Sequence, residues 1–110
     1  RQSLRQRVSS AAVRYETNFR RADWRLIASE ANAGDVRFDL VFLTRDGEIC
    51  CDEIKTGSAA TDHRHSITAQ AEAQLAAGIE AYGPTFSGVR VVLLAANESI
   101  WINQTTGIAT

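Results

Sequence analysis

The stretch that decides the fold is residues 36–55, VRFDLVFLTRDGEICCDEIK. Two runs rich in Val, Ile, Leu, Phe and Cys, residues 36–44 and 48–55, are separated by the loop RDG, residues 45–47. This pattern predicts a β-hairpin. A three-residue loop that ends in Gly is a favoured hairpin turn, because Gly adopts the positive φ of the closing bulge.

The length of this loop fixes which residues face each other. It places Asp39 opposite Glu53 and, two positions further along, it places Arg37 opposite Lys55. Opposed residues point to the same face of a sheet, so we expect these four charged side chains to lie close together. Asp52 falls on the other face, so either that end of the sheet is open to water or the register differs by one residue. That other face is otherwise apolar and comprises Phe38, Leu40, Phe42, Cys50 and Ile54.

Two opposed carboxylates repel each other, so a sheet keeps them where a cation lies between them or where one is protonated. Lys55 is one candidate cation, and it is the only Lys among the 12 basic residues. Its ammonium group is a compact point charge. A divalent ion, Mg²⁺ or Mn²⁺, is the other candidate, because Mg²⁺ is commonly held by one or two carboxylates with water and substrate phosphate.

Asp39, followed on the next strand by Glu53-Ile54-Lys55, resembles the active-site pattern of the PD-(D/E)XK nuclease superfamily. Phe38 stands where the Pro of the family name precedes the acid. The resemblance implies a restriction-endonuclease-like α/β fold with an α-β-β-β-α-β core, in which helices flank a mixed central sheet. It also implies that residues 1–110 form a single nuclease-like domain.

The rest of the chain predicts the same order of elements. Helical spacing of apolar residues indicates an amphipathic helix over residues 3–19 and a second helix over residues 66–82. Strands are expected at residues 24–31, 88–96 and 99–103. The run GVRVVLLAA at 88–96 is almost continuously apolar, which is typical of a strand buried on both faces of a sheet.

The resemblance also implies roles for the charged residues. Asp39, Glu53 and the carbonyl group of Ile54 would hold Mg²⁺ or Mn²⁺ and so lower the pKa of a bound water. Lys55 would position that water or neutralise charge on the phosphate. These residues are the expected catalytic centre of a metal-dependent endonuclease.

Members of the superfamily often place a Glu from the first helix at this centre, and Glu16 is the candidate, with Glu30 as a second. A surface pair between Glu16 and Arg20 is the alternative, because residues four apart on a helix are neighbours. Gln70 and Gln74 match a Gln that many members carry on the second helix. The candidates for substrate binding are Arg37, Thr56, Arg64, Gln70 and Gln74.

Charge is distributed unevenly along the chain, whose formal net charge is −1. Residues 1–25 hold seven Arg and two acids, whereas residues 26–110 hold five basic and eleven acidic residues. A basic arm beside an acidic body fits a protein that contacts phosphate with one surface and holds metal with another. A solvated Arg-rich helix is the alternative, and the acidic body could bind a basic protein.

The composition also bears on the protein's setting. No apolar run approaches the roughly 20 residues that span a bilayer. The chain has no Met, so we expect a domain taken from a longer protein, with targeting signals elsewhere. A disulfide between the neighbours Cys50 and Cys51 would be strained, so free thiols in a reducing compartment are expected.

Among PD-(D/E)XK proteins, the chain resembles the C-terminal nuclease toxin domains of bacterial contact-dependent growth inhibition and polymorphic toxin systems. This resemblance implies secretion within a larger bacterial protein, action in the cytoplasm of the target cell, and neutralisation by a cognate immunity protein. DNA is the favoured substrate, because the sequence lacks an aromatic platform for single-stranded RNA; tRNA stays open. The alternatives are a DNA-repair or junction-resolving nuclease and a non-catalytic binding domain with the same fold.

Overall fold

The computed structural model describes residues 4–57 and 64–104. It contains two helices and five strands in the predicted α-β-β-β-α-β order, followed by one further strand. The fold class predicted from the sequence is therefore confirmed. The element bounds are α1 Leu4–Asn18, β1 Trp24–Ala33, β2 Val36–Thr44, β3 Ile49–Lys55, α2 Arg64–Tyr82, the 3-10 turn η2 Gly83–Thr85, β4 Phe86–Leu93 and β5 Glu98–Ile102.

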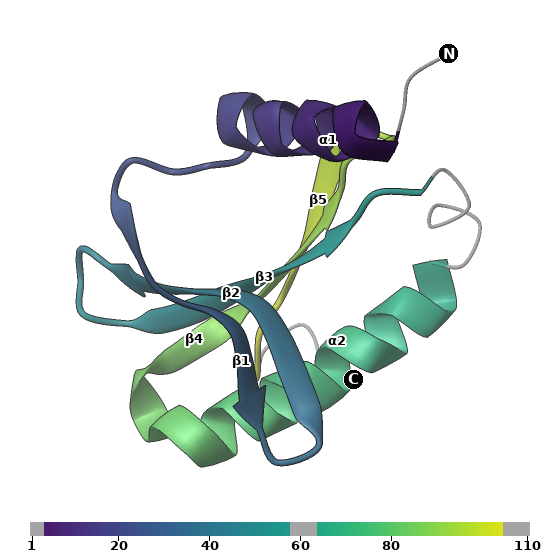
Figure 1. Cartoon of the computed structure of the whole chain (residues 1–110). Helices are drawn as coiled ribbons and strands as arrows, with labels where there is room; N and C mark the ends of the chain where they lie inside the picture. The colour runs from purple at the N-terminus through teal and green to yellow at the C-terminus, as the bar shows by residue number, and fades with distance from the viewer. Residues whose placement is uncertain (1–3, 58–63, 105–110) are drawn as a thin grey trace.

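The five strands form one mixed sheet in the order β1-β2-β3-β4-β5. Strands β1 to β3 form an antiparallel meander, β4 is parallel to β3, and β5 is antiparallel to β4. Parallel neighbours need a crossover connection, which here includes α2. The two helices lie on opposite sides of the sheet, with α1 above it and α2 below it in the view of Figure 1.

Each helix covers its own apolar cluster. The cluster under α2 comprises Phe38, Val41, Cys51, Ile67, Ala71, Leu75, Phe86, Val89, Val91, Leu93 and Ile102. The cluster under α1 comprises Tyr15, Phe19, Phe42, Cys50, Val92 and Leu94. Strand β4 contributes to both clusters, as the continuous apolar run predicted. Its Val91 and Val92 point to opposite faces and are both almost completely buried.

The central hairpin has the predicted register from Leu40 to Leu43, whereas the predicted pairs of Asp39 with Glu53 and of Arg37 with Lys55 are not formed, because the pairing of β2 with β3 ends at Leu40. Leu43 pairs with Ile49, and Leu40 pairs with Asp52. The turn is closed by a hydrogen bond of 2.8 Å from the Thr44 N–H to the Glu48 carbonyl. Asp52 therefore lies opposite Leu40 on the α1 side of the sheet.

The prediction that Phe38 shares a face with Leu40 and Phe42 is wrong. Phe38 packs in the cluster under α2, whereas Leu40 and Phe42 pack under α1. The main-chain pairing of β2 with β3 ends at Leu40. Because β2 leaves the regular ladder there, the two-residue alternation of faces does not continue to Phe38.

The two cysteines are free and buried, in agreement with the prediction of free thiols. They are neighbours on β3 and point to opposite faces of the sheet, so each joins a different cluster. Burial raises the pKa of the Cys50 thiol to about 12. It also raises the pKa of the Cys51 thiol. Both thiols are therefore uncharged core residues at neutral pH.

Substituting Gly78 by Ala is expected to lower the free energy of unfolding by about 1–3 kcal/mol, the usual range for overpacking. A Cβ at Gly78 would lie 2.3 Å from Cζ and 2.4 Å from Cε2 of Phe86. This contact outweighs the roughly 1 kcal/mol by which Ala exceeds Gly in helix propensity. Urea denaturation of Gly78→Ala, and of Gly78→Ala with Phe86→Leu, measures the effect. If Ala at this position stabilises the protein without the second change, α2 and Phe86 are not packed tightly.

Candidate active site

The candidate site begins where β2 separates from β3. At this point Oδ2 of Asp39 accepts a hydrogen bond of 2.8 Å from the main-chain N–H of Ile54. A side-chain carboxylate thus satisfies a strand N–H, the role that a carbonyl group has in a regular ladder. Asp39 is held at the fork between the two strands with 20% of its side chain exposed.

Glu53 lies on the α2 side of β3, and only 10% of its side chain is exposed. Its Oε1 is 3.3 Å from Nζ of Lys55, which points to the same side. The Lys55 ammonium group also donates to Oε1 of Gln70 on α2, at 3.1 Å. The only Lys of the chain is therefore held between an acid on the sheet and an amide on the helix.

Gln74 joins the three elements of the site. It is buried, with 2% exposure. Its Nε2 lies 2.7 Å from Oε2 of Glu53 and 3.1 Å from the carbonyl oxygen of Arg37, and donates to both. The amide thus ties α2 to β3 and β2. Its Oε1 is buried and has no hydrogen-bond partner in the described part of the chain.

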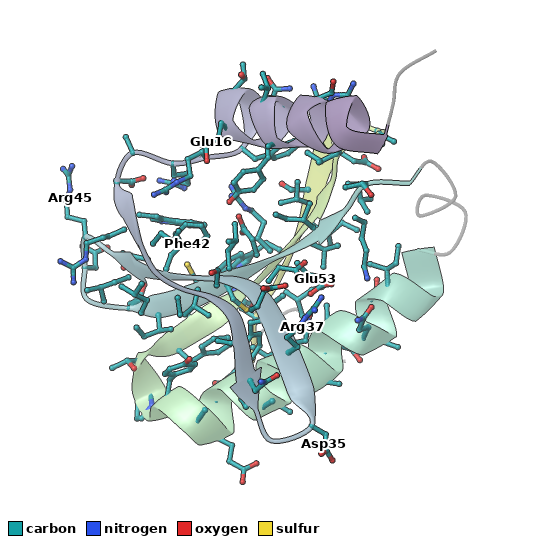
Figure 2. All side chains as sticks on the ribbon, viewed as in Figure 1. Glu16, Asp35, Arg37, Phe42, Arg45 and Glu53 are labelled. Carbon is teal, nitrogen blue, oxygen red and sulfur yellow. The ribbon has the colours of Figure 1, made fainter. Side chains whose placement is uncertain are left out.

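Arg37 is exposed and contacts two carboxylates. Its Nη2 lies 3.3 Å from Oδ1 of Asp39. Its Nη1 lies 3.8 Å from Oε1 of Glu30 on β1. Arg37 and Glu53 lie close together between the sheet and α2, which Figure 2 shows below the crossing of the strands.

The structure thus brings together six of the ten predicted site residues through their side chains, and a seventh, Ile54, through its main chain. The six are Arg37, Asp39, Glu53, Lys55, Gln70 and Gln74. Thr56 is exposed and directly follows β3. Arg64 is the first residue of α2, and the structure does not describe its side chain.

Glu16 is not part of this group. It is exposed on α1 and lines a cavity of about 250 Å³ between that helix and the sheet, together with Leu40, Phe42 and Ile54. Leu40 and Phe42 belong to the face under α1, whereas Glu53 contacts α2. In Figure 2 the labelled Glu16 lies beside α1 and the labelled Glu53 lies below the strands. Glu30 reaches the group only through Arg37.

The donor set can be tested against the predicted metal. In residues 4–57 and 64–104, no group of three or more His, Cys, Asp or Glu side chains gathers to hold an ion. Two carboxylates and a main-chain carbonyl are too few for a structural zinc site, which needs four protein ligands. They fit Mg²⁺, which usually keeps several waters and takes only one or two carboxylates.

A second charged network, behind the site, was not predicted. Asp52 is completely buried on the α1 side, and Arg90 on β4 contacts both of its oxygens, at 2.8 and 2.7 Å. The Tyr15 hydroxyl of α1 donates to the same carboxylate. Burial and this hydrogen bond raise the pKa of Tyr15. The sequence signals were an acid on an apolar face and a single Arg inside an apolar strand.

The helices of the described part do not include one with the length and apolar character required to cross a bilayer.

Two solved structures are similar to this chain. The structure of an EndoMS–dsDNA complex superposes with a TM-score of 0.52 and 14% identity, covering 83% of this chain and 36% of that one. The crystal structure of a repair endonuclease from Pyrococcus abyssi gives a TM-score of 0.48 and 16% identity, covering 83% and 37%. The chain thus spans little more than a third of the length of either protein. No protein-family model and no curated protein matches the sequence.

Proposed function

We propose that this domain is a metal-dependent nuclease that hydrolyses phosphodiester bonds, with DNA as the favoured substrate and tRNA as the second. The observation that carries the proposal is that Asp39 accepts a hydrogen bond from the Ile54 N–H at the fork of β2 and β3, where Ile54 stands between the paired residues Glu53 and Lys55 on β3. Support comes from the α/β fold shared with the structure of an EndoMS–dsDNA complex. It also comes from the motif, which resembles that of PD-(D/E)XK nucleases.

In this proposal Asp39, Glu53 and the Ile54 carbonyl hold Mg²⁺ or Mn²⁺. The ion would polarise the phosphate and lower the pKa of a bound water. Lys55 stabilises the negative charge on the phosphate oxygens through its ammonium group. Gln74 keeps the Glu53 carboxylate oriented through its hydrogen bond of 2.7 Å. Glu16 is given no role here, because it lies on α1, whereas Glu53 and Lys55 contact α2 on the other side of the sheet.

Contacts to the substrate are assigned to the polar residues around the fork. The exposed guanidinium of Arg37 can pair with a phosphate in a bidentate manner. Gln70 lies beside Lys55, and Thr56 follows it at the exposed end of β3. Arg64, at the start of α2, belongs to the same set by sequence position.

The test is cleavage of supercoiled plasmid DNA and of total tRNA by the pure protein with Mg²⁺ or Mn²⁺. Asp39→Asn is the inactive variant, because Asn still accepts the hydrogen bond from Ile54 but loses the charge. Asp46→Asn is the matched control, because it removes one charge from the exposed hairpin turn. We expect wild type and Asp46→Asn to cut at least one substrate, and Asp39→Asn to cut about 100-fold more slowly or worse. Cleavage by Asp39→Asn at the wild-type rate would refute the proposed role of Asp39, and no cleavage by wild type would refute the proposed enzyme.

For the biological setting we propose a bacterial toxin domain that is delivered in a larger protein to the target-cell cytoplasm and bound there by an immunity protein. It is supported by the resemblance of the motif to contact-dependent toxin domains. Expression of the domain in bacteria should arrest growth, and expression of Asp39→Asn should not. Normal growth with active nuclease would favour the second candidate, a DNA-repair or junction-resolving enzyme.

A further inference from the structure

The two acids of the site are each paired with a cation, and the two pairs differ in their surroundings. Glu53 and Lys55 are 10% and 26% exposed, and Gln70 and Gln74 hold them in place. Asp39 and Arg37 are 20% and 60% exposed. Exposed ion pairs contribute little to stability, because water and salt compete for both charges. Arg37 is therefore the cation that can leave at small cost, whereas Lys55 is held.

Arg37 also has a second carboxylate beside it. Its guanidinium lies between Asp39, at 3.3 Å, and Glu30, at 3.8 Å. Ser29 pairs with Leu40 and Ala31 pairs with Phe38, so Glu30 is at the level of Asp39 on the neighbouring strand. The backbone of Glu30 has a φ of 49°, which is unusual for a residue other than Gly. Arg37 can move away from Asp39 and remain paired with Glu30.

We propose that Arg37 is the internal counter-ion of Asp39 in the metal-free site and is released toward Glu30 and a substrate phosphate when a divalent ion binds. This coupling rests on the proposed nuclease function. A divalent ion at Asp39 carries twice the charge of the guanidinium and repels it. The released guanidinium has a planar fork of donors that matches a phosphate. Metal loading would thus create a phosphate contact that the metal-free site does not offer.

The coupling must be reciprocal. If the metal raises the affinity for phosphate through Arg37, then phosphate raises the affinity for the metal by the same factor. The protein would then bind its metal weakly when it is free and more tightly when nucleic acid is bound. Without the guanidinium, the affinity for metal in the absence of nucleic acid should rise. The increase in metal affinity that nucleic acid causes should become smaller.

The first measurement is the Mn²⁺ affinity of the protein without nucleic acid, by isothermal titration calorimetry. Arg37→Gln is expected to bind Mn²⁺ about three- to tenfold more tightly than wild type. The variant lacks a positive charge that competes with the metal for Asp39 and repels it, and an exposed ion pair of this kind changes a binding constant by about this factor. The main-chain carbonyl of residue 37, which accepts from Gln74, is kept in this variant. Arg25→Gln is the matched control, because it removes an exposed Arg near the other end of the hairpin of β1 and β2. Equal or weaker Mn²⁺ binding by Arg37→Gln would overturn the inference.

The second measurement is binding of a short DNA duplex over a series of salt concentrations, with EDTA and with Ca²⁺, which takes the same oxygen ligands as Mg²⁺. One lost phosphate contact lowers the slope of log K against log salt by about 0.9. We expect Arg37→Gln to show this loss with Ca²⁺ and not with EDTA. A loss of equal size in both conditions would mean that Arg37 contacts phosphate without being released by metal, and would overturn the coupling.

The two levels of the proposal fail in different ways. If wild type binds no Mn²⁺ and cuts no nucleic acid, the nuclease function and the coupling both fall. If wild type binds Mn²⁺ and cuts, while Arg37→Gln has wild-type metal affinity, only the coupling falls. The melting temperatures of Arg37→Gln and Arg25→Gln, compared with wild type, exclude unfolding as the cause of any difference.

Discussion

Replacing Arg90 by Leu is expected to lower the free energy of unfolding by about 3–5 kcal/mol, the cost of leaving one partner of a buried ion pair alone. The Asp52 carboxylate is completely buried, and the Arg90 side chain is 12% exposed. Without Arg90 this carboxylate keeps the hydrogen bond from the Tyr15 hydroxyl. One neutral donor does not compensate a buried charge.

The loss would extend beyond Asp52, because Arg90 connects several segments. Its Nη2 also donates to the carbonyl of Phe19, at 2.9 Å, just after α1 ends. Its guanidinium lies 4.8 Å from the ring of Trp24, where β1 begins. A domain of this size is stable by about 5–15 kcal/mol. Arg90→Leu should therefore bring the protein close to unfolding, with α1 losing its packing first.

Urea denaturation of three variants separates charge from packing. Arg90→Leu combined with Asp52→Leu should recover most of the lost stability, because no charge stays buried and apolar replacements of buried ion pairs are often neutral or stabilising. Tyr15→Phe should cost less than Arg90→Leu, about 1.5–3 kcal/mol, the usual value of one hydrogen bond to a charged group. If Arg90→Leu unfolds within 1 kcal/mol of wild type, the network does not hold α1 to the sheet.

Replacing Lys55 by Met is expected to slow cleavage about 100- to 1,000-fold, the range found when one stabilising donor is removed from a developing oxyanion. The free energy of unfolding should fall by about 1–2 kcal/mol, between the values for exposed and for buried ion pairs, because Glu53 is buried but the Lys55 side chain is 26% exposed. Gln74 also continues to donate to Glu53. The large kinetic effect with a small stability effect is what distinguishes a catalytic Lys from a structural one.

Two further variants define what the site needs at residue 55. Lys55→Arg keeps the charge but spreads it over a larger planar group. Its cleavage rate should therefore stay below about a tenth of the wild-type rate. Gln70→Ala removes the amide that contacts Nζ at 3.1 Å and leaves the ammonium in place. We expect it to slow cleavage about tenfold or less. Wild-type cleavage by Lys55→Met would leave the residue as no more than a partner of Glu53.

The register of the hairpin could be predicted from the sequence because a three-residue loop ending in Gly47 permits few pairings. That register correctly placed Asp52 opposite Leu40. It could not show that β2 leaves the ladder at Asp39. At this point the Asp39 side chain accepts a hydrogen bond from the Ile54 N–H, and a pattern of apolar and polar residues contains no information about such a bond.

Residues from the second half of the chain were harder to place. Gln74 was selected only through the resemblance, and its two hydrogen bonds depend on how α2 packs against the sheet. Asp52 was recognised as an awkward acid, yet its partner Arg90 is 38 positions away, across a parallel pairing. No turn length fixes the register of parallel strands, because a long crossover joins them. Glu16 lay at the edge of its helical stripe, where spacing alone does not determine the side of the sheet it serves.

The hydrogen bond between Asp39 and the Ile54 N–H has a consequence for how such a protein can change during evolution. A lineage that lost cleavage would be released from the requirement for an ammonium group at residue 55, and that position would drift. Residue 39 would not be released, because the strand still needs an acceptor there. Inactive descendants should therefore retain Asp or Asn at this position, and a survey that finds apolar residues there as often as at residue 55 would contradict this expectation.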